Sequence, residues 1–394
     1  MTRDAQLILA VGAVLAAGLV AAGVAARLRL PALVLFCGLG MLVGSDGLGL
    51  VPFNDYRLAR LIGTIALVLI LFEGGLAAGW RELRPVLRPA LLLAVLGTVL
   101  TATIVGLVAS ALFDFSLLEG LLLGAILAAT DGAAVFALLR GVRLPLRLRR
   151  TLEGESGFND PVAVLLVLVT IDLITSPHHS VGSTVLFVVH EVTVGTAVGL
   201  AGGVAARAVR HAHRLPNGLM LVGSLAAAAL AYGIAAALGG SGFLAVYMVG
   251  LAFGDVSFAE RRSVVAFHRG LAMVAEIGMF FALGLLVFPS QFGPIVAEGV
   301  LLAVITAVIA RPLASTVATI GQGFTPSERV LLAWAGLRGA VPVVLATFAV
   351  IDGVPRSVEL LNIVFFAVLL SAALQGATVE ALANRLLPRT ADES

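Results

Sequence analysis

The chain has 394 residues, of which 60% are hydrophobic and 12% are charged, and its formal net charge is +2. This composition, with a mean hydropathy of +1.09, excludes a soluble globular domain. The chain has arginine but no lysine, and most of the arginines lie in short loops between apolar segments. This distribution of positive charge indicates membrane topology rather than nucleic-acid binding. We therefore expect an all-α polytopic membrane protein that contacts lipid and has no nucleic-acid partner and no cofactor.

Thirteen apolar segments are predicted to cross the bilayer, because runs of about 20 apolar residues recur along the chain. They lie at about 6–26, 31–50, 58–78, 89–112, 117–139, 155–175, 184–206, 216–237, 241–254, 267–288, 294–318, 327–352 and 357–381. Nineteen arginines fall on one side of this alternation and four on the other. The positive-inside rule then places the N-terminus outside the cell membrane and the C-terminus in the cytoplasm. We expect one transmembrane domain over 1–390, a tail at 391–394 and no cytoplasmic regulatory domain.

A faint internal repeat relates segments that are seven apart. Three pairs of short motifs match at offsets of 207 to 210 residues: Leu39–Gly44 with Val249–Gly254, Phe72 and Gly75 with Phe281 and Gly284, and Asp131–Ala134 with Arg338–Val341. Because seven helices separate the members of each pair, the two units insert with opposite orientation. The sequence therefore predicts an inverted repeat of helices 1–6 and 8–13, the plan of many secondary transporters.

Segment six opens with a polar motif, Leu152–Pro161, that places two carboxylates at membrane depth. On a helix, Ser156 and Asp160 share one face, while Glu155 and Asn159 share the adjacent face. Pro161 lacks an N–H, so the carbonyl four residues earlier loses its helical partner. A hydroxyl, a carboxylate and a carbonyl are hard oxygen ligands and suit an alkali cation. The alternative interpretation is a helix N-cap by Ser156 with solvated acids.

Segments five and twelve each contain an interruption beside a charged residue, Asp131 in the first and Arg338 in the second. Paired interruptions in corresponding halves are the best sequence pointer to a transporter site. Broken helices leave half-helix ends with partial charge. We expect Asp131 to compensate the positive N-termini and Arg338 to compensate the negative C-termini of two discontinuous crossing helices, 5 and 12.

Two further charged residues lie inside apolar segments. Arg311 would be costly to bury without a partner, and Glu155 is the natural one, which leaves Asp160 to exchange ligands. Glu73 lies about two-thirds of the way through segment three. It either lines the access path or lies near the cytoplasmic interface.

These motifs together resemble the monovalent cation/proton antiporter-1 family of bacterial NhaP type. The resemblance rests on Thr130-Asp131, on Glu155–Pro161, on Ala310–Pro312 and on Gly336–Ala340, in that order along the whole chain. The motif from Leu152 to Gly157 and the one from Trp334 to Pro342 are more similar still to the CvrA-like potassium/proton antiporter branch of the family.

The resemblance implies a homodimer of thirteen-helix subunits. Each subunit would have a core bundle at about 89–175 and 294–381, and a dimerisation bundle at about 6–78 and 184–288. It assigns the ion site to Thr130, Ser156 and Asp160, with Glu155 paired to Arg311 and Glu73 on the cytoplasmic path. Members of the CvrA-like branch usually add a cytoplasmic domain after the last helix, which we do not expect from this sequence.

The mechanism expected from these residues is antiport of Na⁺ or K⁺ against H⁺. Asp160 would bind either a proton or a cation, and the core bundle would expose it to each side in turn. Asn159 replaces the second acid of electrogenic family members, so exchange is expected to be electroneutral and one-for-one. Glu73 in its Phe-Glu-Gly-Gly motif favours sodium, whereas the motif around Arg338 favours potassium.

Two other classes of function were weighed. A cation channel needs a continuous polar pore and a filter of repeated carbonyls or charge rings, and the sequence shows one compact acidic site instead. A membrane-embedded hydrolase would need a base beside Ser156, and no His or Lys accompanies it. The sequence therefore favours the antiporter.

Overall fold

The computed structural model describes residues 3–28, 32–139, 142, 144–176, 180–212, 218–255 and 261–387. Within these ranges every regular element is a helix. The tail at 391–394 lies outside the described residues. So do five of the arginines used for the topology: Arg29, Arg140, Arg143, Arg214 and Arg389.

The first half of the chain contains nine described α-helices. They are α1 (Arg3–Leu28), α2 (Ala32–Val43), α3 (Tyr56–Ala78), α4 (Trp80–Leu83), α5 (Leu87–Leu92), α6 (Thr98–Leu112), α7 (Leu117–Ala128), α8 (Gly132–Leu138) and α9 (Leu146–Thr175). A 3₁₀ turn at Arg84–Val86 joins α4 to α5, and a π-helical turn at Leu93–Gly97 joins α5 to α6.

The second half also contains nine described α-helices. They are α10 (Val181–Ala212), α11 (Leu219–Ala237), α12 (Gly242–Gly254), α13 (Arg261–Leu285), α14 (Val296–Ile305), α15 (Arg311–Ala318), α16 (Pro326–Trp334), α17 (Ala340–Ile351) and α18 (Ser357–Leu386). Two 3₁₀ turns, Pro289–Gln291 and Gly293–Ile295, precede α14, and a π-helical turn at Thr306–Ala310 joins α14 to α15.

Nine helical stretches of the described chain are long and apolar enough to cross a bilayer. Four shorter apolar helices accompany them: α2, α7, α12 and α17. The all-helical, multi-pass membrane architecture expected from the composition is therefore confirmed.

Several helix boundaries differ from the expected segments, and those of α9 and α2 show two physical reasons. Helix α9 begins at Leu146, nine residues before the apolar segment expected at 155. Its first turns are charged and carry ion pairs from Arg149 and Arg150 to Glu153, so the helix continues where hydropathy ends. Helix α2 ends at Val43 rather than near 50, because the chain turns back and the N–H of Leu48 donates to the carbonyl of Leu42 at 2.7 Å.

The glycines in the repeated motifs lie where helices cross most closely. A Cβ added to Gly250 of α12 would lie 3.2 Å from Cα of Gly75 of α3, and one added to Gly40 of α2 would lie 2.9 Å from Cα of Gly284 of α13. Small residues let membrane helices approach at backbone distance. Because Gly40 matches Gly250 and Gly75 matches Gly284 in the repeat, the two crossings correspond to each other.

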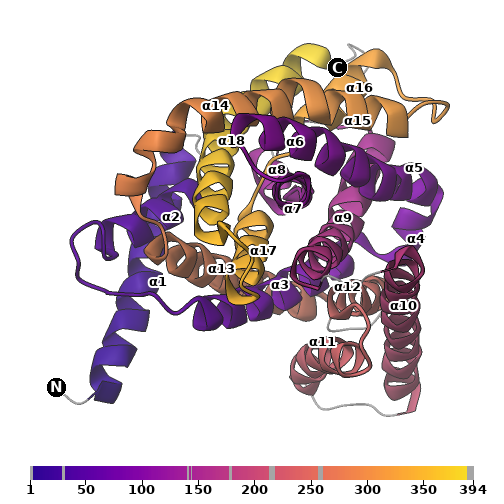
Figure 1. The fold of residues 1–394 in the computed structure, drawn as a ribbon. Helices are drawn as coiled ribbons and strands as arrows, with labels where there is room; N and C mark the ends of the chain where they lie inside the picture. The colour runs from indigo at the N-terminus through magenta and orange to yellow at the C-terminus, as the bar shows by residue number, and fades with distance from the viewer. Residues whose placement is uncertain are drawn as a thin grey trace.

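The helices pack in two groups that alternate along the chain. Helices α2, α3, α10, α11, α12 and α13 pack mainly on one another. The second group consists of α6, α7 and α9 together with α14 to α18, and contacts of α14 with α6 and of α17 and α18 with α7 join its two parts. Figure 1 shows α10, α11 and α12 at one corner and α14, α15 and α16 along the opposite edge, with α17 beside α18 between them. Helix α3 contacts α9 and α17 and so bridges the groups.

The close crossing of α3 and α12 predicts the effect of a methyl group. In Gly250→Ala the added Cβ would lie 2.6 Å from the carbonyl oxygen of Phe72, so the helices must separate. Overpacking of this kind costs about 1–3 kcal/mol, and we expect a lower Tm of the detergent-solubilised protein. The matched control is Gly233→Ala on α11, where a Cβ meets nothing within 4 Å. A Gly250→Ala protein that melts at or above the wild-type temperature would contradict this packing.

Candidate ion-binding site

The first helix break, at residues 129–131 between α7 and α8, exposes the N-terminus of α8 inside the protein. Three groups satisfy its backbone. The carboxylate of Asp131 accepts from the N–H of Ala134 at 3.0 Å, and the hydroxyl of Ser156 on α9 accepts from the N–H of Gly132 at 2.9 Å. The N–H of Asp131 donates to the carbonyl of Leu337 at 2.7 Å. Asp131 therefore caps the positive helix end that the sequence assigned to it.

Asn159 on α9 holds the same break from the other side. Its amide oxygen accepts from the N–H of Thr130 at 2.9 Å, and its amide nitrogen donates to the hydroxyl of Thr98 and, at 3.4 Å, to the carbonyl of Ala128. The side chain is fully buried. An amide can both donate and accept, so Asn159 bonds both the N–H of Thr130 and the carbonyl of Ala128. An ionised carboxylate only accepts and could not bond the carbonyl.

The second helix break, at residues 335–339 between α16 and α17, carries Arg338. The guanidinium donates from Nε to the carbonyl of Leu127 at 3.0 Å and from another nitrogen to the carbonyl of Gly336. These carbonyls lie at the C-terminal ends of α7 and α16, where the helix dipoles place negative partial charge. Arg338 therefore joins the two breaks through backbone acceptors.

Glu155 and Arg311 form the ion pair that the sequence suggested. The guanidinium of Arg311 donates to Oε1 of Glu155. The side chain of Arg311 is 1% exposed and that of Glu155 is 2% exposed. Gly336 leaves room for this pair, because a Cβ there would lie 2.5 Å from Nε of Arg311. A buried pair of this kind neutralises both charges in place.

Two residues that contact the polar motif of α9, Thr98 and Arg311, each follow a π-helical turn. Thr98, which accepts from Asn159, comes directly after the turn at Leu93–Gly97, and Arg311 comes directly after the turn at Thr306–Ala310. The two positions are 213 residues apart, close to the repeat offset. Single π-helical turns are frequent at functional sites, and here each one precedes a side chain that contacts α9.

Asp160 differs from Glu155, although the two lie on the same stretch of α9. Its side chain is buried, with 7% of its surface exposed, and no described group hydrogen-bonds to its Oδ1. A buried carboxylate oxygen without a partner is costly, so this atom is the one in the site most in need of a proton or a cation.

The proposed ligands are brought together only in part. Thr130 and Ser156 line a small cavity of about 10 Å³ together with Glu155 and Arg311. This volume is close to the room needed for one water molecule. Asp160 is not among the lining residues, so the structure places the two hydroxyl residues around one space that Asp160 does not line.

Tyr247 of α12 covers the middle of the α9 motif. Its ring lies directly against the backbone of Gly157 and meets the ring of Phe158 edge-on, with centroids 5.1 Å apart. Any side chain at position 157 would overlap this ring. The tyrosine hydroxyl is buried, and no described group bonds to it.

Glu73 lies apart from these residues, near the end of α3. Its Oε1 is 3.9 Å from Nε of Arg269 on α13, and its side chain is 19% exposed. Among the contacts described for this side chain, none reaches Asp160, Ser156 or Thr130.

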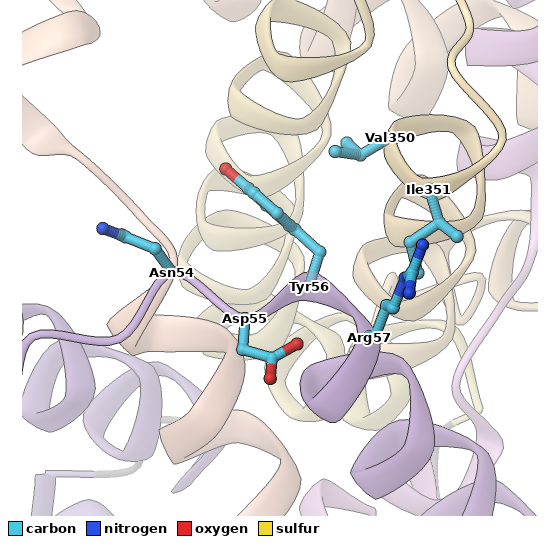
Figure 2. A pocket seen from close by; sticks show the side chains of 6 residues that line it. All are labelled: Asn54, Asp55, Tyr56, Arg57, Val350 and Ile351. Atoms are coloured by element: carbon cyan, nitrogen blue, oxygen red, sulfur yellow. The ribbon is translucent and has the colours of Figure 1, made fainter.

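A larger hollow lies away from the site. It has a volume of about 500 Å³, and Figure 2 shows it between the residues leading into α3, Asn54 to Arg57, and the last residues of α17, Val350 and Ile351. Asp55 is occupied as the N-cap of α3, accepting from the N–H of Leu58 at 2.9 Å. The residues predicted for the ion site do not line this hollow, and it adds no ligand to the site.

Sequence reasoning missed Thr98 and the residues on α18 that hold the second break. Thr98 sits in an otherwise apolar segment, and its burial gave no sign in the sequence. Ser371 accepts from the N–H of Arg338 at 3.2 Å, and Gln375 donates to the carbonyl of Trp334 at 3.2 Å. The available signal was their spacing of four, the same as that of Ser156 and Asp160.

Comparison with known proteins gives relatives along almost the whole chain. The K⁺/H⁺ antiporter NhaP2 of Shewanella sp. (strain ANA-3) is 38% identical over 378 residues, which cover 95% of this chain and 66% of that protein. The Na⁺/H⁺ antiporter ApNhaP of Aphanothece halophytica is 32% identical over 366 residues, which cover 86% of this chain and 68% of that protein. The chain thus spans slightly less than two-thirds of the length of the Shewanella relative.

Among solved structures, the sodium/proton antiporter MjNhaP1 of Methanocaldococcus jannaschii at pH 8 matches with a TM-score of 0.85 and 26% identity, covering 98% of this chain and all of that one. The sequence model of the family "Sodium/hydrogen exchanger, transmembrane" matches residues 13–385. Because this family model matches nearly the whole chain and relatives of 38% and 32% identity align along most of it, the chain belongs to the sodium/hydrogen exchanger family.

Proposed function

We propose that the chain exchanges a monovalent cation, Na⁺ or K⁺, for a proton across the cell membrane, and that Asp160 is the group for which the two ions compete. One observation carries this proposal. Of the two buried acids in one stretch of α9, Glu155 is neutralised by Arg311, whereas Oδ1 of Asp160 has no described partner. Family membership and the names of the relatives support it.

Competition for one carboxylate is enough to couple the two fluxes. Burial disfavours the charged form of Asp160, so the group takes up a proton unless a cation neutralises it. Ser156 precedes Asp160 by about one turn of α9, and Thr130 lines a small cavity with Ser156; both would offer hydroxyl oxygens, which suit an alkali cation. Glu73, with its partly exposed carboxylate, would line the cytoplasmic approach.

We further propose thirteen membrane spans, formed by the nine long helical stretches and the four shorter apolar helices. Helices 5 and 12 would be the discontinuous crossings, α7–α8 and α16–α17. The core bundle at about 89–175 and 294–381 would move against a dimerisation bundle at about 6–78 and 184–288, within a homodimer. The N-terminus would lie outside the cell membrane and the C-terminus in the cytoplasm.

The preferred cation can be identified by comparing transport rates in salts that differ only in the cation. The relatives include proteins named for potassium and one named for sodium, so both ions are candidates. Proton flux into proteoliposomes, measured in Na⁺, Li⁺ and K⁺ salts at one ionic strength, identifies the transported ion. Uphill cation movement driven by a proton gradient separates exchange from a channel.

Replacing Asp160 by Asn should reduce cation-dependent proton flux to the level of empty liposomes, because an amide cannot alternate between a proton and a cation. The size and the buried position of the side chain are kept. The matched control is Glu380→Gln near the end of α18, which should retain wild-type flux. Exchange that persists in the Asp160→Asn protein would refute the proposal.

Exchange by the wild-type protein should be electroneutral. Asn159 is a fixed amide bonded to Thr130, Thr98 and Ala128, so Asp160 is the one titrating group at this point of α9. One cation would then leave for each proton that enters. The exchange rate should be unchanged when a membrane potential of either sign is imposed on the vesicles, and a rate that follows the potential would rule out one-for-one exchange.

Removing the partner of Arg311 should destabilise the protein. Glu155→Gln leaves a buried guanidinium uncompensated, and breaking such a pair costs about 3–5 kcal/mol. We expect a clear fall in Tm, measured by scanning fluorimetry in detergent. The double variant Glu155→Gln with Arg311→Met removes the unpaired charge and should recover much of the loss. Equal melting of wild type and Glu155→Gln would show that the pair does not stabilise the fold.

A further inference from the structure

The two helix breaks are held by two uninterrupted helices, α9 and α18, in the same way. Ser156 of α9 accepts from the N–H of Gly132 at 2.9 Å, and Ser371 of α18 accepts from the N–H of Arg338 at 3.2 Å. The two serines are 215 residues apart, near the offset of the internal repeat. Each serine thus satisfies a backbone N–H at or next to the break of its own half.

An amide beside each serine completes the same arrangement. Asn159 donates to the carbonyl of Ala128, the last residue of α7, at 3.4 Å. Gln375 donates to the carbonyl of Trp334, the last residue of α16, at 3.2 Å. In both halves, therefore, an uninterrupted helix satisfies the carbonyl at which the broken helix stops.

The halves differ in charge. The residue four positions after the serine is Asp160 in the first half and Gln375 in the second. Gln375 is 1% exposed and accepts from the hydroxyl of Ser371 at 2.6 Å, so its oxygen is satisfied where that of Asp160 is not. The second half has a permanent cation in the break itself, the guanidinium of Arg338.

We propose that Gln375 and Ser371 form a positioning pair for the ion site, acting through Arg338. The contacts form a continuous chain. Gln375 orients Ser371, Ser371 holds the backbone of Arg338, and the guanidinium of Arg338 donates to the carbonyl of Leu127 at 3.0 Å. Leu127 directly precedes Ala128. Asn159 donates to the carbonyl of Ala128 and accepts from the N–H of Thr130, which ends the chain of contacts at the first break.

This inference rests on the proposed exchange function and adds a role for the second half of the repeat. When the pair is lost, Arg338 is no longer fixed, and the C-terminal end of α7 loses a charged donor. The first break then relaxes around Thr130, so the ion-bound state is weakened more than the turnover step. The expected signature is a higher KM for the cation with a nearly unchanged maximal rate.

The test compares two single variants and their combination in proteoliposomes. Gln375→Met keeps the length of the side chain and removes its amide. Ser371→Ala removes only a hydroxyl, so the test can still be made with this variant if Gln375→Met does not yield folded protein. Each should raise the KM for the cation by roughly three- to tenfold. The double variant should not exceed the larger single effect, because both changes break one chain of contacts. Ser371→Thr retains the hydroxyl and should restore the wild-type KM.

A matched control separates positioning from simple loss of helix packing. Thr378→Val removes the hydrogen bond from Nε1 of Trp334 at 3.0 Å, which joins the same helices, α16 and α18, without contacting Arg338. It should leave the KM unchanged, whatever it does to Tm. The inference fails if wild type exchanges ions while both Ser371→Ala and Gln375→Met bind the cation as wild type does, or if Thr378→Val raises the KM equally. A wild-type protein with no cation-dependent proton flux would instead refute the proposed function.

Discussion

Two helices that stop and restart inside an apolar protein leave backbone N–H and C=O groups that no water reaches, and other parts of the chain must satisfy them. Several of the polar residues in the interior serve this requirement. Asp131, Ser156 and Asn159 bond the first break, while Arg338 and Ser371 bond the second. The proposed ion site thus lies next to backbone groups that already have hydrogen-bond partners.

The same constraint explains why the charges are divided as they are. A buried acid must be paired, bonded or neutralised, and the structure treats its two neighbouring acids differently. Glu155 is permanently neutralised by Arg311, while Asp160 keeps an oxygen available. Asn159 between them contributes polarity without charge, so it can bond a donor and an acceptor in every state of the site.

The sequence predicted these features unevenly, for physical reasons. Hydropathy located the apolar segments well, because burial in lipid demands long apolar runs, but it misplaced the start of α9, where a charged helix continues beyond the apolar run. The pair of Glu155 and Arg311 could be inferred because two opposite charges in apolar segments have few other partners. The acceptors of Arg338 could not, since backbone carbonyls carry no sequence signature. Nor could the sequence show that the cavity between Thr130 and Ser156 excludes Asp160.

The ion pair between Glu155 and Arg311 also has a consequence for biogenesis. Its members are 156 residues apart in the chain and belong to opposite halves of the repeat. During synthesis Glu155 enters the membrane long before Arg311 exists, and each charge costs about 2.5–3.5 kcal/mol at the centre of an inserting helix. Glu155 in the first half of the repeat therefore stays unpaired until the second half, with Arg311, has been inserted. Formation of the ion pair then stabilises the packing of the two sets of helices against each other. Assembly of this protein is in this sense a late event, directed by one contact deep in its interior.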